Sequence, residues 1–250
     1  MKNTKLDAFL GGKIRLFQPL NGYRANSDSI LLAAAVDAKK GQSILELGCG
    51  IGAVLFSLMS RVDALQVVGV EIQKKYAQLA LRNAEHNGFK ADILHCDITD
   101  IPNEYKQINY NHVVLNPPFF NQNSSMKSGQ LDKDLSKRES GISLNTWLNV
   151  AIRRCAPKGE VVIMHRATRL TEILKSFDGR LGDIKILPIS SFEGTPATRI
   201  IIKGKKGSAS PLSILAPFVL HNVKGEDRII ETYTISAERI LREGRPLDWI

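Results

Sequence analysis

Two short segments carry residue types that could hold two small molecules side by side. The first is Glu46-Leu47-Gly48-Cys49-Gly50-Ile51-Gly52, which follows the apolar run Ser43–Leu45. Glycines at alternate positions allow a sharp turn from a strand into a helix and a close approach of the backbone to a ligand. The second is Asn116-Pro117-Pro118-Phe119, directly after Val113–Leu115. Together they predict a site that places a nucleotide-like ligand beside a planar amino group.

The second segment has the groups needed to prepare an exocyclic amine for attack. Such an amine is a poor nucleophile because its lone pair is conjugated into the ring. The side-chain oxygen of Asn116 and the carbonyl of Pro117 could each accept one N–H bond and favour a pyramidal nitrogen. Pro118 makes the corner rigid, and Phe119 and Phe120 could stack on the base. A plain strand-ending turn is the alternative, but it would not require Asn first and an aromatic residue last.

Acidic residues lie at the ends of three consecutive predicted strands. Glu46 precedes Gly48 by two residues, and Glu71 ends the next strand, Val67–Val70. Glu71 follows Gly48 by 23 residues, a position from which an acid can accept hydrogen bonds from both ribose hydroxyls. Asp97 follows the third strand, where an acid could meet an adenine amino group. A solvated strand end is the alternative for Glu71 and, more strongly, for Asp97.

The glycine segment allows two interpretations of the ligand. Gly48-x-Gly50-x-x-Ala53 fits the relaxed dinucleotide fingerprint, so a nicotinamide-dependent dehydrogenase is one alternative. The complete pattern Glu-x-Gly-x-Gly-x-Gly over residues 46–52, followed by Glu71 and Asp97, resembles the S-adenosylmethionine (SAM) methyltransferases of the Rossmann-like class. This resemblance implies that SAM is the cofactor and that its binding residues are Glu46, Gly48, Gly50, Gly52, Glu71, Asp97 and Asn116.

Residues near the N-terminus could complete the cofactor site. Tyr23, Arg24 and Asp28 could close over the methionine end of the cofactor, with Asp28 meeting its ammonium group. For Asp28 a helix-capping role is an equally good interpretation, because Ser27–Asp28 precedes the apolar run Ile30–Val36.

The tetrapeptide Asn116–Phe119 resembles the fourth motif of amino-group methyltransferases acting on adenine N6, guanine N2 or glutamine. The leader (residues 6–12, 22–24 and 28–32) and the tail (196–199 and 204–207) are similar to the bacterial tRNA(Val) adenine-N6 methyltransferase family. The resemblance covers nearly the whole chain, with Phe119 where many members carry Tyr. It implies cytoplasmic methylation of an adenosine in the anticodon loop of a tRNA, with Asn116, Pro117, Pro118 and Phe119 as the catalytic segment.

The net charge of the whole chain is +9. The basic residues flank the glycine-rich half of the chain. Residues 41–120 carry 6 Lys and Arg against 8 Asp and Glu, whereas residues 121–210 carry 16 against 8. A basic balance favours an anionic partner such as nucleic acid, with solubility as the alternative. Lys133, Lys137 and Arg138, in the polar segment 121–145, are candidate RNA contacts together with Phe119 and Phe120; a solvated loop is the alternative.

Several classes of protein are disfavoured. No run of 18 apolar residues predicts a membrane span, and no signal-like segment follows the basic N-terminus. Cys49, Cys96 and Cys155 are widely spaced, which indicates free thiols in a reducing compartment. We expect neither a metal nor a membrane partner. The oligomeric state stays open.

Strands and helices alternate along the chain. Strands are predicted over 43–47, 67–70, 92–95, 111–115, 160–165, 183–187 and 198–203, and helices over 30–36, 53–60, 74–87, 147–155 and 170–177. This order predicts an α/β fold with a doubly wound, seven-stranded, mostly parallel sheet that ends in an antiparallel hairpin.

The N-terminal part is predicted to be an extension of that fold. Its first 25 residues suggest a small β-hairpin with a turn at Asn21-Gly22. We expect residues 1–40 to form a hairpin-and-helix extension and residues 41–250 to form the methyltransferase domain.

We expect the reaction to be methyl transfer from SAM to the N6 amine of an adenosine in tRNA. The same chemistry on guanine N2 or on a protein glutamine is the alternative, although 40 leader residues leave little room for the helical domain that glutamine methylators usually carry. A dehydrogenase or a non-catalytic RNA-binding module is less favoured. A dehydrogenase would leave Asn116–Phe119 unexplained, and a binding module would show no turnover with SAM.

Overall fold

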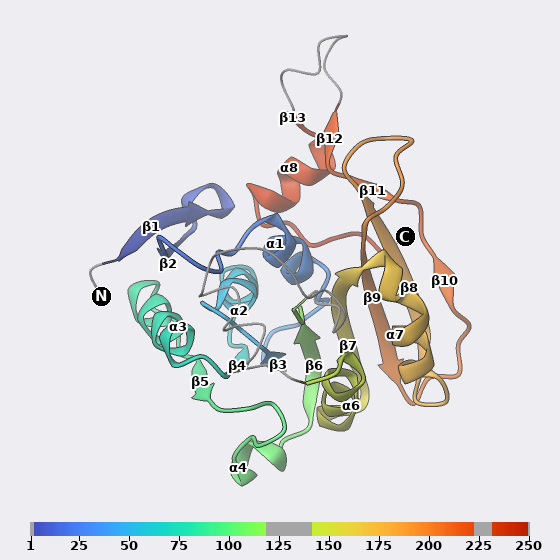
Figure 1. Ribbon diagram of the computed structural model, residues 1–250, viewed down its shortest axis with the longest axis horizontal. Helices are drawn as coiled ribbons and strands as arrows, with labels where there is room; N and C mark the ends of the chain where they lie inside the picture. The colour runs from blue at the N-terminus through green and yellow to red at the C-terminus, as the bar shows by residue number, and fades with distance from the viewer. Residues whose placement is uncertain (1–2, 119–141, 223–231, 250) are drawn as a thin grey trace, which may run out of the picture.

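The computed structural model describes residues 3–118, 142–222 and 232–249. A twisted sheet runs through the centre of the molecule (Figure 1). Its seven main strands, in spatial order, are β8 (Leu181–Ser190), β9 (Arg199–Lys206), β7 (Cys155–Arg166), β6 (Tyr110–Leu115), β3 (Ser43–Leu47), β4 (Gln66–Glu71) and β5 (Asp92–His95). The two-residue strands β10 (Ser213–Ile214) and β11 (Phe218–Val219) extend the β8 edge.

The strand directions confirm the predicted fold class. Of the seven main strands, β9 runs antiparallel to its neighbours β7 and β8, and the other pairings are parallel. The predicted terminal hairpin is therefore β8–β9, with β9 inserted between β8 and β7. Val113, Val114 and Leu115 of β6 are fully buried, as expected for a parallel strand covered on both faces.

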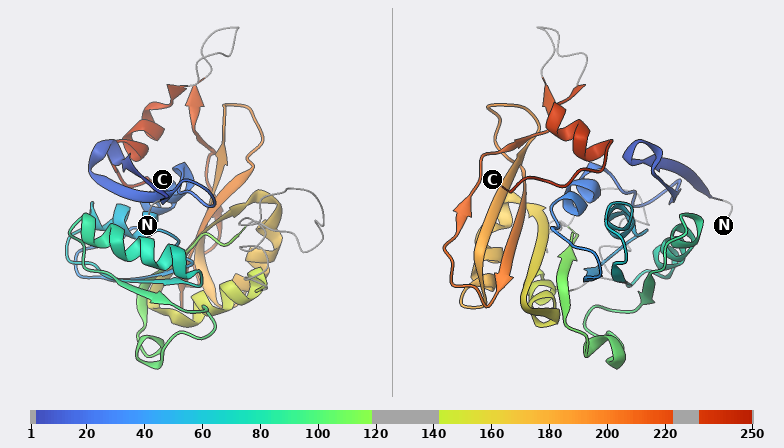
Figure 2. Two further views of the ribbon diagram at one scale, coloured as in Figure 1. Left: turned by 60° about the vertical axis from the view of Figure 1, so that its left-hand side comes forward. Right: turned by 180° about the vertical axis from the view of Figure 1, so that it is seen from behind.

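Helices cover both faces of the sheet (Figure 2). One face packs against a hydrophobic cluster to which α1 (Ser27–Ala34), α2 (Ala53–Met59), α3 (Lys74–His86) and α8 (Ile235–Leu241) contribute. The opposite face packs against α6 (Leu144–Arg154) and α7 (Leu170–Phe177). A single helical turn, α4 (Asn103–Lys106), follows β5. None of the helices in the described residues combines the length and apolar character needed to cross a membrane.

The N-terminal hairpin is present, but its turn lies elsewhere than predicted. Strands β1 (Thr4–Phe9) and β2 (Ile14–Pro19) pair antiparallel and are joined by the 3-10 turn η1 (Leu10–Gly12). Leu10, Gly11 and Gly12 all have positive φ, which reverses the chain at this point. The predicted turn at Asn21-Gly22 is therefore wrong, because that dipeptide follows β2 and leads the chain towards α1.

Two asparagines one helical turn apart fasten this hairpin to α3. Asn83 Oδ1 accepts from the Phe17 amide at 2.7 Å, and Asn83 Nδ2 donates to the carbonyls of Phe17 and Ile51 at 3.2 and 3.0 Å. Asn87 repeats the pattern with the amide and carbonyl of Arg15, at 2.9 and 2.8 Å. Four residues along a helix and two along a strand both span roughly 6–7 Å, so the two asparagines match alternate residues of β2.

The C-terminal segment closes over α1. Trp249 is buried, and its Nε1 donates to the Ala35 carbonyl at 3.0 Å, while the Leu247 amide donates to the Ala34 carbonyl at 2.8 Å. Trp249 is therefore part of the hydrophobic core. Leu16 and Leu31 of the leader share one hydrophobic cluster with the sheet. The division of the chain at residue 40 stays a prediction.

Replacing Asn83 by Ala should strongly destabilise the protein. The substitution leaves the buried backbone groups of Phe17 and Ile51 without partners, at about 1–3 kcal/mol each. We expect the free energy of unfolding in urea to fall by about 2–4 kcal/mol. Asn87→Ala is the matched control, because it removes the same kind of pair from a partly exposed position and should cost less than about 1 kcal/mol. Equal losses in the two variants would contradict this account.

Candidate active site

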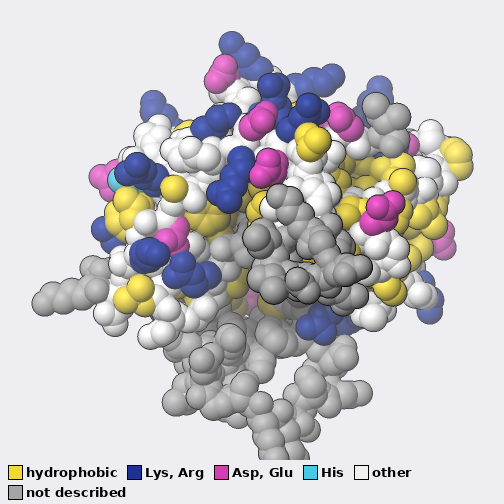
Figure 3. Space-filling view, turned by 90° about the horizontal axis from the view of Figure 1, so that it is seen from above, with side chains coloured by type: hydrophobic (Ala, Val, Ile, Leu, Met, Phe, Trp, Pro, Cys, Tyr) yellow, Lys and Arg dark blue, Asp and Glu magenta, His cyan; other side chains and the backbone are white. Residues whose placement is uncertain are grey.

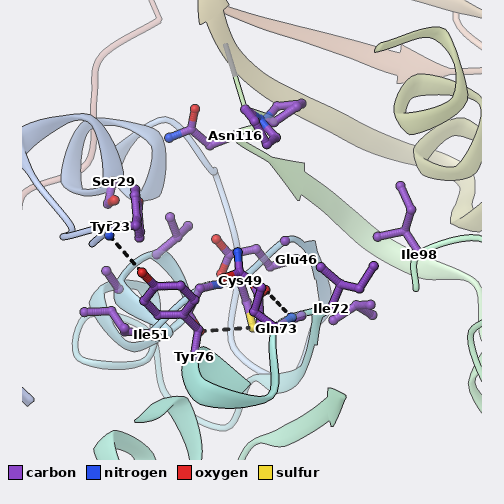
Figure 4. A pocket seen from close by; sticks show the side chains of 18 of the residues that line it. Tyr23, Ser29, Glu46, Cys49, Ile51, Ile72, Gln73, Tyr76, Ile98 and Asn116 are labelled. Carbon is purple, nitrogen blue, oxygen red and sulfur yellow. Dashed lines mark hydrogen bonds between the residues drawn. The ribbon is translucent and has the colours of Figure 1, made fainter. Parts of the chain in front are cut away.

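The two chemistry-bearing segments begin side by side at the same edge of the sheet. Leu47, the last residue of β3, pairs with Leu115, the last residue of β6. The chain leaves β3 towards β4 and β5 and then crosses to β6 on the other side of β3. Ligands in open parallel sheets bind at such a change of direction, outside the carboxyl ends of the strands. A cavity of about 490 Å³ lies there, within the usual range for small-molecule sites (Figure 4).

The glycine segment could not be built from larger residues. Gly48, Gly50 and Gly52 have φ values of 71°, 55° and 84°. A Cβ atom on Gly52 would lie 2.1 Å from the Phe56 ring, and one on Gly48 would lie 2.9 Å from the Trp147 ring. Backbone conformation and lack of space therefore both require glycine. The turn delivers the chain into α2 and leaves its backbone against the cavity.

The carboxylate of Glu71 fastens this loop to β4. Its Oε2 accepts from the Gly50 amide at 2.9 Å, and its Oε1 accepts from the Gln73 amide at 2.8 Å. Burial raises the pKa of Glu71, and these two amides oppose the rise. A carboxylate has about four acceptor sites, so Glu71 can hold the loop and still accept bonds from a ligand in the cavity.

Glu46 contributes a second buried acid to the same cavity. It is 2% exposed, and its Oε2 has no hydrogen-bond partner among the described residues. Burial raises the pKa of Glu46 well above its ordinary value, and the charge of Glu71 adds to the rise. An unsatisfied buried carboxylate is unfavourable unless a donor or a cation completes it. The cavity is therefore built to receive positive charge.

Asp28 lines the cavity from α1 and forms an ion pair with Arg199 at the start of β9. Burial raises the pKa of the Asp28 carboxyl, and Arg199 opposes the rise. The predicted cap at Ser27–Asp28 is wrong, because Asn26 is the N-cap and its Oδ1 accepts from the Asp28 amide at 3.0 Å. Asp28 instead occupies the first turn. No sequence pattern indicates the contact with Arg199, which is 171 residues away.

Asp97 is held in a self-contained turn and is not one of the described residues that line the cavity. Its Oδ1 accepts from the amide and the hydroxyl of Thr99, at 2.8 and 2.7 Å. The next residue, Ile98, does line the cavity. A direct role for Asp97 in binding a ligand stays a prediction.

The Asn-Pro-Pro corner forms the wall of the cavity opposite the glycine loop. Asn116 Oδ1 is buried and has no hydrogen-bond partner among the described residues. Asn116, Pro117 and Pro118 all line the cavity, as Figure 4 shows for the labelled Asn116. The remaining residues predicted to act here lie outside the described residues: Phe119, Phe120, Lys133, Lys137 and Arg138.

Tyr23 and Tyr76 form a wall that the sequence predicted only in part. The Tyr76 hydroxyl accepts from the Tyr23 amide at 2.8 Å, and the two rings meet edge to face with centroids 6.1 Å apart. A Cβ atom on Gly50 would lie 3.3 Å from the Tyr23 ring, so this ring lies over the glycine loop. Tyr23 was expected here. Tyr76 was missed because an aromatic residue on the apolar face of α3 resembles an ordinary core residue.

Comparison with known proteins agrees with this geometry. Residues 24–131 match the family model for the methyltransferase small domain, a range that contains both motifs. The chain is 29% identical over 183 residues to the tRNA1(Val) (adenine(37)-N6)-methyltransferase of Actinobacillus pleuropneumoniae, covering 72% of this chain and 75% of the relative. The enzyme of the same name from Bacteroides fragilis is 26% identical over 183 residues, covering 72% and 76%.

Solved structures share the fold. A predicted O-methyltransferase from Agrobacterium tumefaciens superposes with a TM-score of 0.69 at 22% identity, covering 87% of this chain and 96% of that one. The 16S rRNA N2 G1207 methyltransferase of T. thermophilus, solved with AdoMet and guanosine, superposes with a TM-score of 0.58 at 19% identity, covering 82% and 50%.

The fold, the glycine loop and these matches define a SAM-dependent methyltransferase. Its curated relatives are the tRNA1(Val) adenine-N6 methyltransferases, the family that the motifs resemble. The cavity fits this cofactor, because SAM carries a sulfonium and an ammonium group and the cavity presents the carboxylates of Asp28, Glu46 and Glu71. The carboxylate of Glu71 would repel the pyrophosphate of a nicotinamide dinucleotide.

Binding of SAM should release protons when the pH is near the raised pKa of Glu46. Lowering the pH through the raised pKa of Glu46 protonates the carboxylate in the free protein, and a bound cation favours its ionised form. Affinity should therefore fall as the pH is lowered through the raised pKa of Glu46. Calorimetry in two buffers of different ionisation enthalpy measures the release, and Glu46→Gln should reduce it. Identical heats in both buffers across this range would show that no buried acid is coupled to binding.

Replacing Tyr76 by Phe should weaken SAM binding. The substitution removes the acceptor that holds the Tyr23 amide, so the Tyr23 ring loses its fixed place over the glycine loop. We expect the Kd for SAM to rise about 5- to 10-fold, the effect of one lost hydrogen bond. Tyr105→Phe is the matched control, since it removes a hydroxyl bonded to Asp92 outside the cavity. An unchanged Kd for SAM in Tyr76→Phe would show that the Tyr76 hydroxyl does not contribute to SAM binding.

Proposed function

We propose that this protein transfers the methyl group of SAM to the exocyclic N6 of an adenine in the anticodon loop of tRNA. The observation that carries the proposal is the buried Oδ1 of Asn116, which has no hydrogen-bond partner among the described residues and belongs to a residue that lines the cavity shared with the glycine loop. An acceptor in that place suits an N–H donor of the methyl acceptor. The names of the relatives point to adenine 37 as the target.

We assign the cofactor end of the cavity to the residues around β3 and β4. Glu71 accepts the ribose hydroxyls while retaining its bonds to Gly50 and Gln73. Glu46 and Asp28 offer negative charge to the cationic groups of the ligand. The backbone of Gly48, Gly50 and Gly52 packs against it, and Asp97 lies towards the adenine end.

The acceptor end of the cavity belongs to the corner after β6. SAM supplies a methyl group on a positively charged sulfur, which is a strong electrophile. Asn116 Oδ1 and the Pro117 carbonyl each accept one N–H of the target amine, which fixes the nitrogen with its lone pair towards the methyl group. Pro118 keeps the corner rigid, and Phe119 stacks on the base. The nitrogen becomes cationic on methylation and loses a proton readily, so no strong base is required at the corner.

The substrate we propose is a folded tRNA in the cytoplasm. The excess of basic residues outside 41–120 supports an anionic partner. Lys133, Lys137 and Arg138 are the proposed phosphate contacts in the segment after the corner. Residues 1–40 are proposed to act as an extension that closes over the cofactor, and residues 41–250 as the methyltransferase domain. The contact of Tyr23 with the glycine loop supports this closing role.

Asn116→Ala should abolish formation of N6-methyladenosine while SAM binding is retained. Loss of a preorganised polar contact to the reacting group lowers turnover by about 10²–10³-fold. Turnover is measured by mass spectrometry of nucleosides from unmodified tRNA incubated with SAM, and SAM affinity by calorimetry. Asn116→Asp, which keeps an acceptor oxygen, should retain more activity than Asn116→Ala.

Two outcomes would contradict the proposal. Equal loss of binding and turnover in Asn116→Ala would mean that the corner is structural. Accumulation of N2-methylguanosine instead of N6-methyladenosine would show that the methyl acceptor is guanine.

A further inference from the structure

Arg199 is a largely buried cation that connects the sheet to the wall of the cavity. It begins β9, and its guanidinium group forms an ion pair with the carboxylate of Asp28 in the first turn of α1. Figure 3 looks onto the edge of the sheet at which the parallel strands end and shows Lys and Arg side chains distributed over that face. The Arg199 side chain is only 21% exposed, and its partner belongs to a residue that lines the cavity.

Asp28 is fixed by its backbone as well as by Arg199. The side chain of Asn26, the N-cap of α1, accepts from the Asp28 amide at 3.0 Å. The Asp28 side chain is 8% exposed, and its Oδ1 is the atom that accepts from Arg199. A carboxylate has about four acceptor sites, so Asp28 can hold Arg199 and still accept from a ligand in the cavity.

A second ion pair joins β9 to the segment after α1, away from the cavity. Lys203 of β9 pairs with Asp37 at 2.5 Å, and its Nζ lies 4.3 Å from the centre of the Trp249 ring. None of these three residues is among the described residues that line the cavity. Lys203 therefore attaches the α1 segment to the sheet without touching the ligand site, whereas Arg199 makes the same kind of attachment at a residue of the site.

Arg199 also keeps Asp28 charged. Burial raises the pKa of the Asp28 carboxyl, and the charge and hydrogen bond of Arg199 oppose the rise. A buried carboxylate without such a partner tends to take up a proton, and a neutral acid no longer attracts a cation. The other titratable or charged side chains that line the cavity are those of Tyr23, Glu46, Cys49, Glu71, Tyr76 and Arg166.

We propose that Arg199 is a positioning residue for the cofactor, which holds the Asp28 carboxylate as the anion that binds the α-ammonium group of SAM. The inference rests on the proposed function, which places Asp28 at the cationic groups of the ligand. Arg199 is not among the described residues that line the cavity, so it acts through Asp28. The planar guanidinium group fixes the direction of the carboxylate that it binds.

The ammonium group suits Asp28 better than the other cationic group of SAM, the sulfonium. An ammonium group has three N–H donors, and carboxylate oxygens accept them in short, charge-assisted hydrogen bonds. A sulfonium has no such donor and must lie beside the Asn-Pro-Pro corner, where its methyl group is transferred. A carboxylate that is already fixed by Arg199 can orient the ammonium group through these bonds and so anchor the methionine end of the cofactor.

The experiment uses ligands that lack one group of the cofactor. Calorimetry measures the Kd of S-adenosylhomocysteine, whose ammonium is its one cationic group, of its analogue without the α-amino group, and of 5′-methylthioadenosine, which lacks the amino-acid part. Each Kd is measured at several pH values on both sides of neutrality, and unfolding in urea gives the stability of each protein. The proteins are the wild type, Arg199→Ala, Arg199→Gln, Arg199→Lys, Asp28→Asn, the double variant Asp28→Asn with Arg199→Ala, and Lys203→Met as the matched control.

We expect Arg199→Ala to raise the Kd for S-adenosylhomocysteine about 10-fold, the effect of one weakened charge-assisted contact. The Kd values of the two ligands without an ammonium group should hardly change. Affinity should begin to fall at a higher pH than in the wild type, because loss of the cation raises the pKa of Asp28 further.

The remaining variants separate charge from structure. Arg199→Lys should keep most of the wild-type pH profile because it keeps the charge, whereas Arg199→Gln should resemble Arg199→Ala. In the Asp28→Asn background, Arg199→Ala should have no further effect on the Kd. Lys203→Met should lower the stability without changing the Kd or its pH profile.

Two results would overturn the inference. An equal rise of the Kd for all three ligands in Arg199→Ala would mean that Arg199 only shapes the cavity. Independent effects of Arg199→Ala and Asp28→Asn would mean that Arg199 does not act through Asp28. If Arg199→Ala does not fold, identical pH profiles in Arg199→Gln and Arg199→Lys would overturn the inference in its place. These measurements contain no RNA, so a failure of the proposed function is seen separately, as a wild type that forms no N6-methyladenosine in tRNA.

Discussion

The parallel pairing of β3 with β6 is the constraint on which the site depends. Leu47 and Leu115 end their strands at the same level, so Gly48 and Asn116 begin their loops on adjacent strands. The two strands are adjacent because β4 and β5 are added on one side of β3, whereas β6 is added on the other side. Parallel strands also require helices as connections, and those helices bury both faces. The fold thus supplies a rigid edge on which the glycine loop and the Asn-Pro-Pro corner meet.

The charges at this edge select what can occupy it. Glu46 and Glu71 are buried with their carboxylates towards one cavity, and an ionised pair there is unfavourable without a cation or donors. Glu71 is partly compensated by two backbone amides, whereas Glu46 Oε2 is uncompensated within the described chain. These buried acids favour a cationic ligand such as the sulfonium of SAM.

Much of this arrangement could be predicted from the sequence because it rests on local signals. Strand–helix alternation, the spaced glycines and the Asn-Pro-Pro corner each act over a few residues, and pairing rules for parallel strands bring them together. The turn of the first hairpin was mispredicted because Asn-Gly is a strong turn signal, whereas Leu10 adopts a positive φ that its residue type disfavours. The contacts of Asp28 with Arg199 and of Tyr76 with Tyr23 join distant segments. No pattern in a single sequence encodes such partners.

The central claim is that the exocyclic nitrogen of adenine receives the methyl group, and isotopic labelling tests it directly. An anticodon stem-loop RNA carrying ¹⁵N only at the exocyclic amine of the target adenosine is incubated with SAM whose methyl group is ¹³C. The account predicts that NMR of the product shows one-bond coupling between the new methyl carbon and ¹⁵N. A ¹³C methyl group without this coupling, on a ring nitrogen or on another base, would contradict the account.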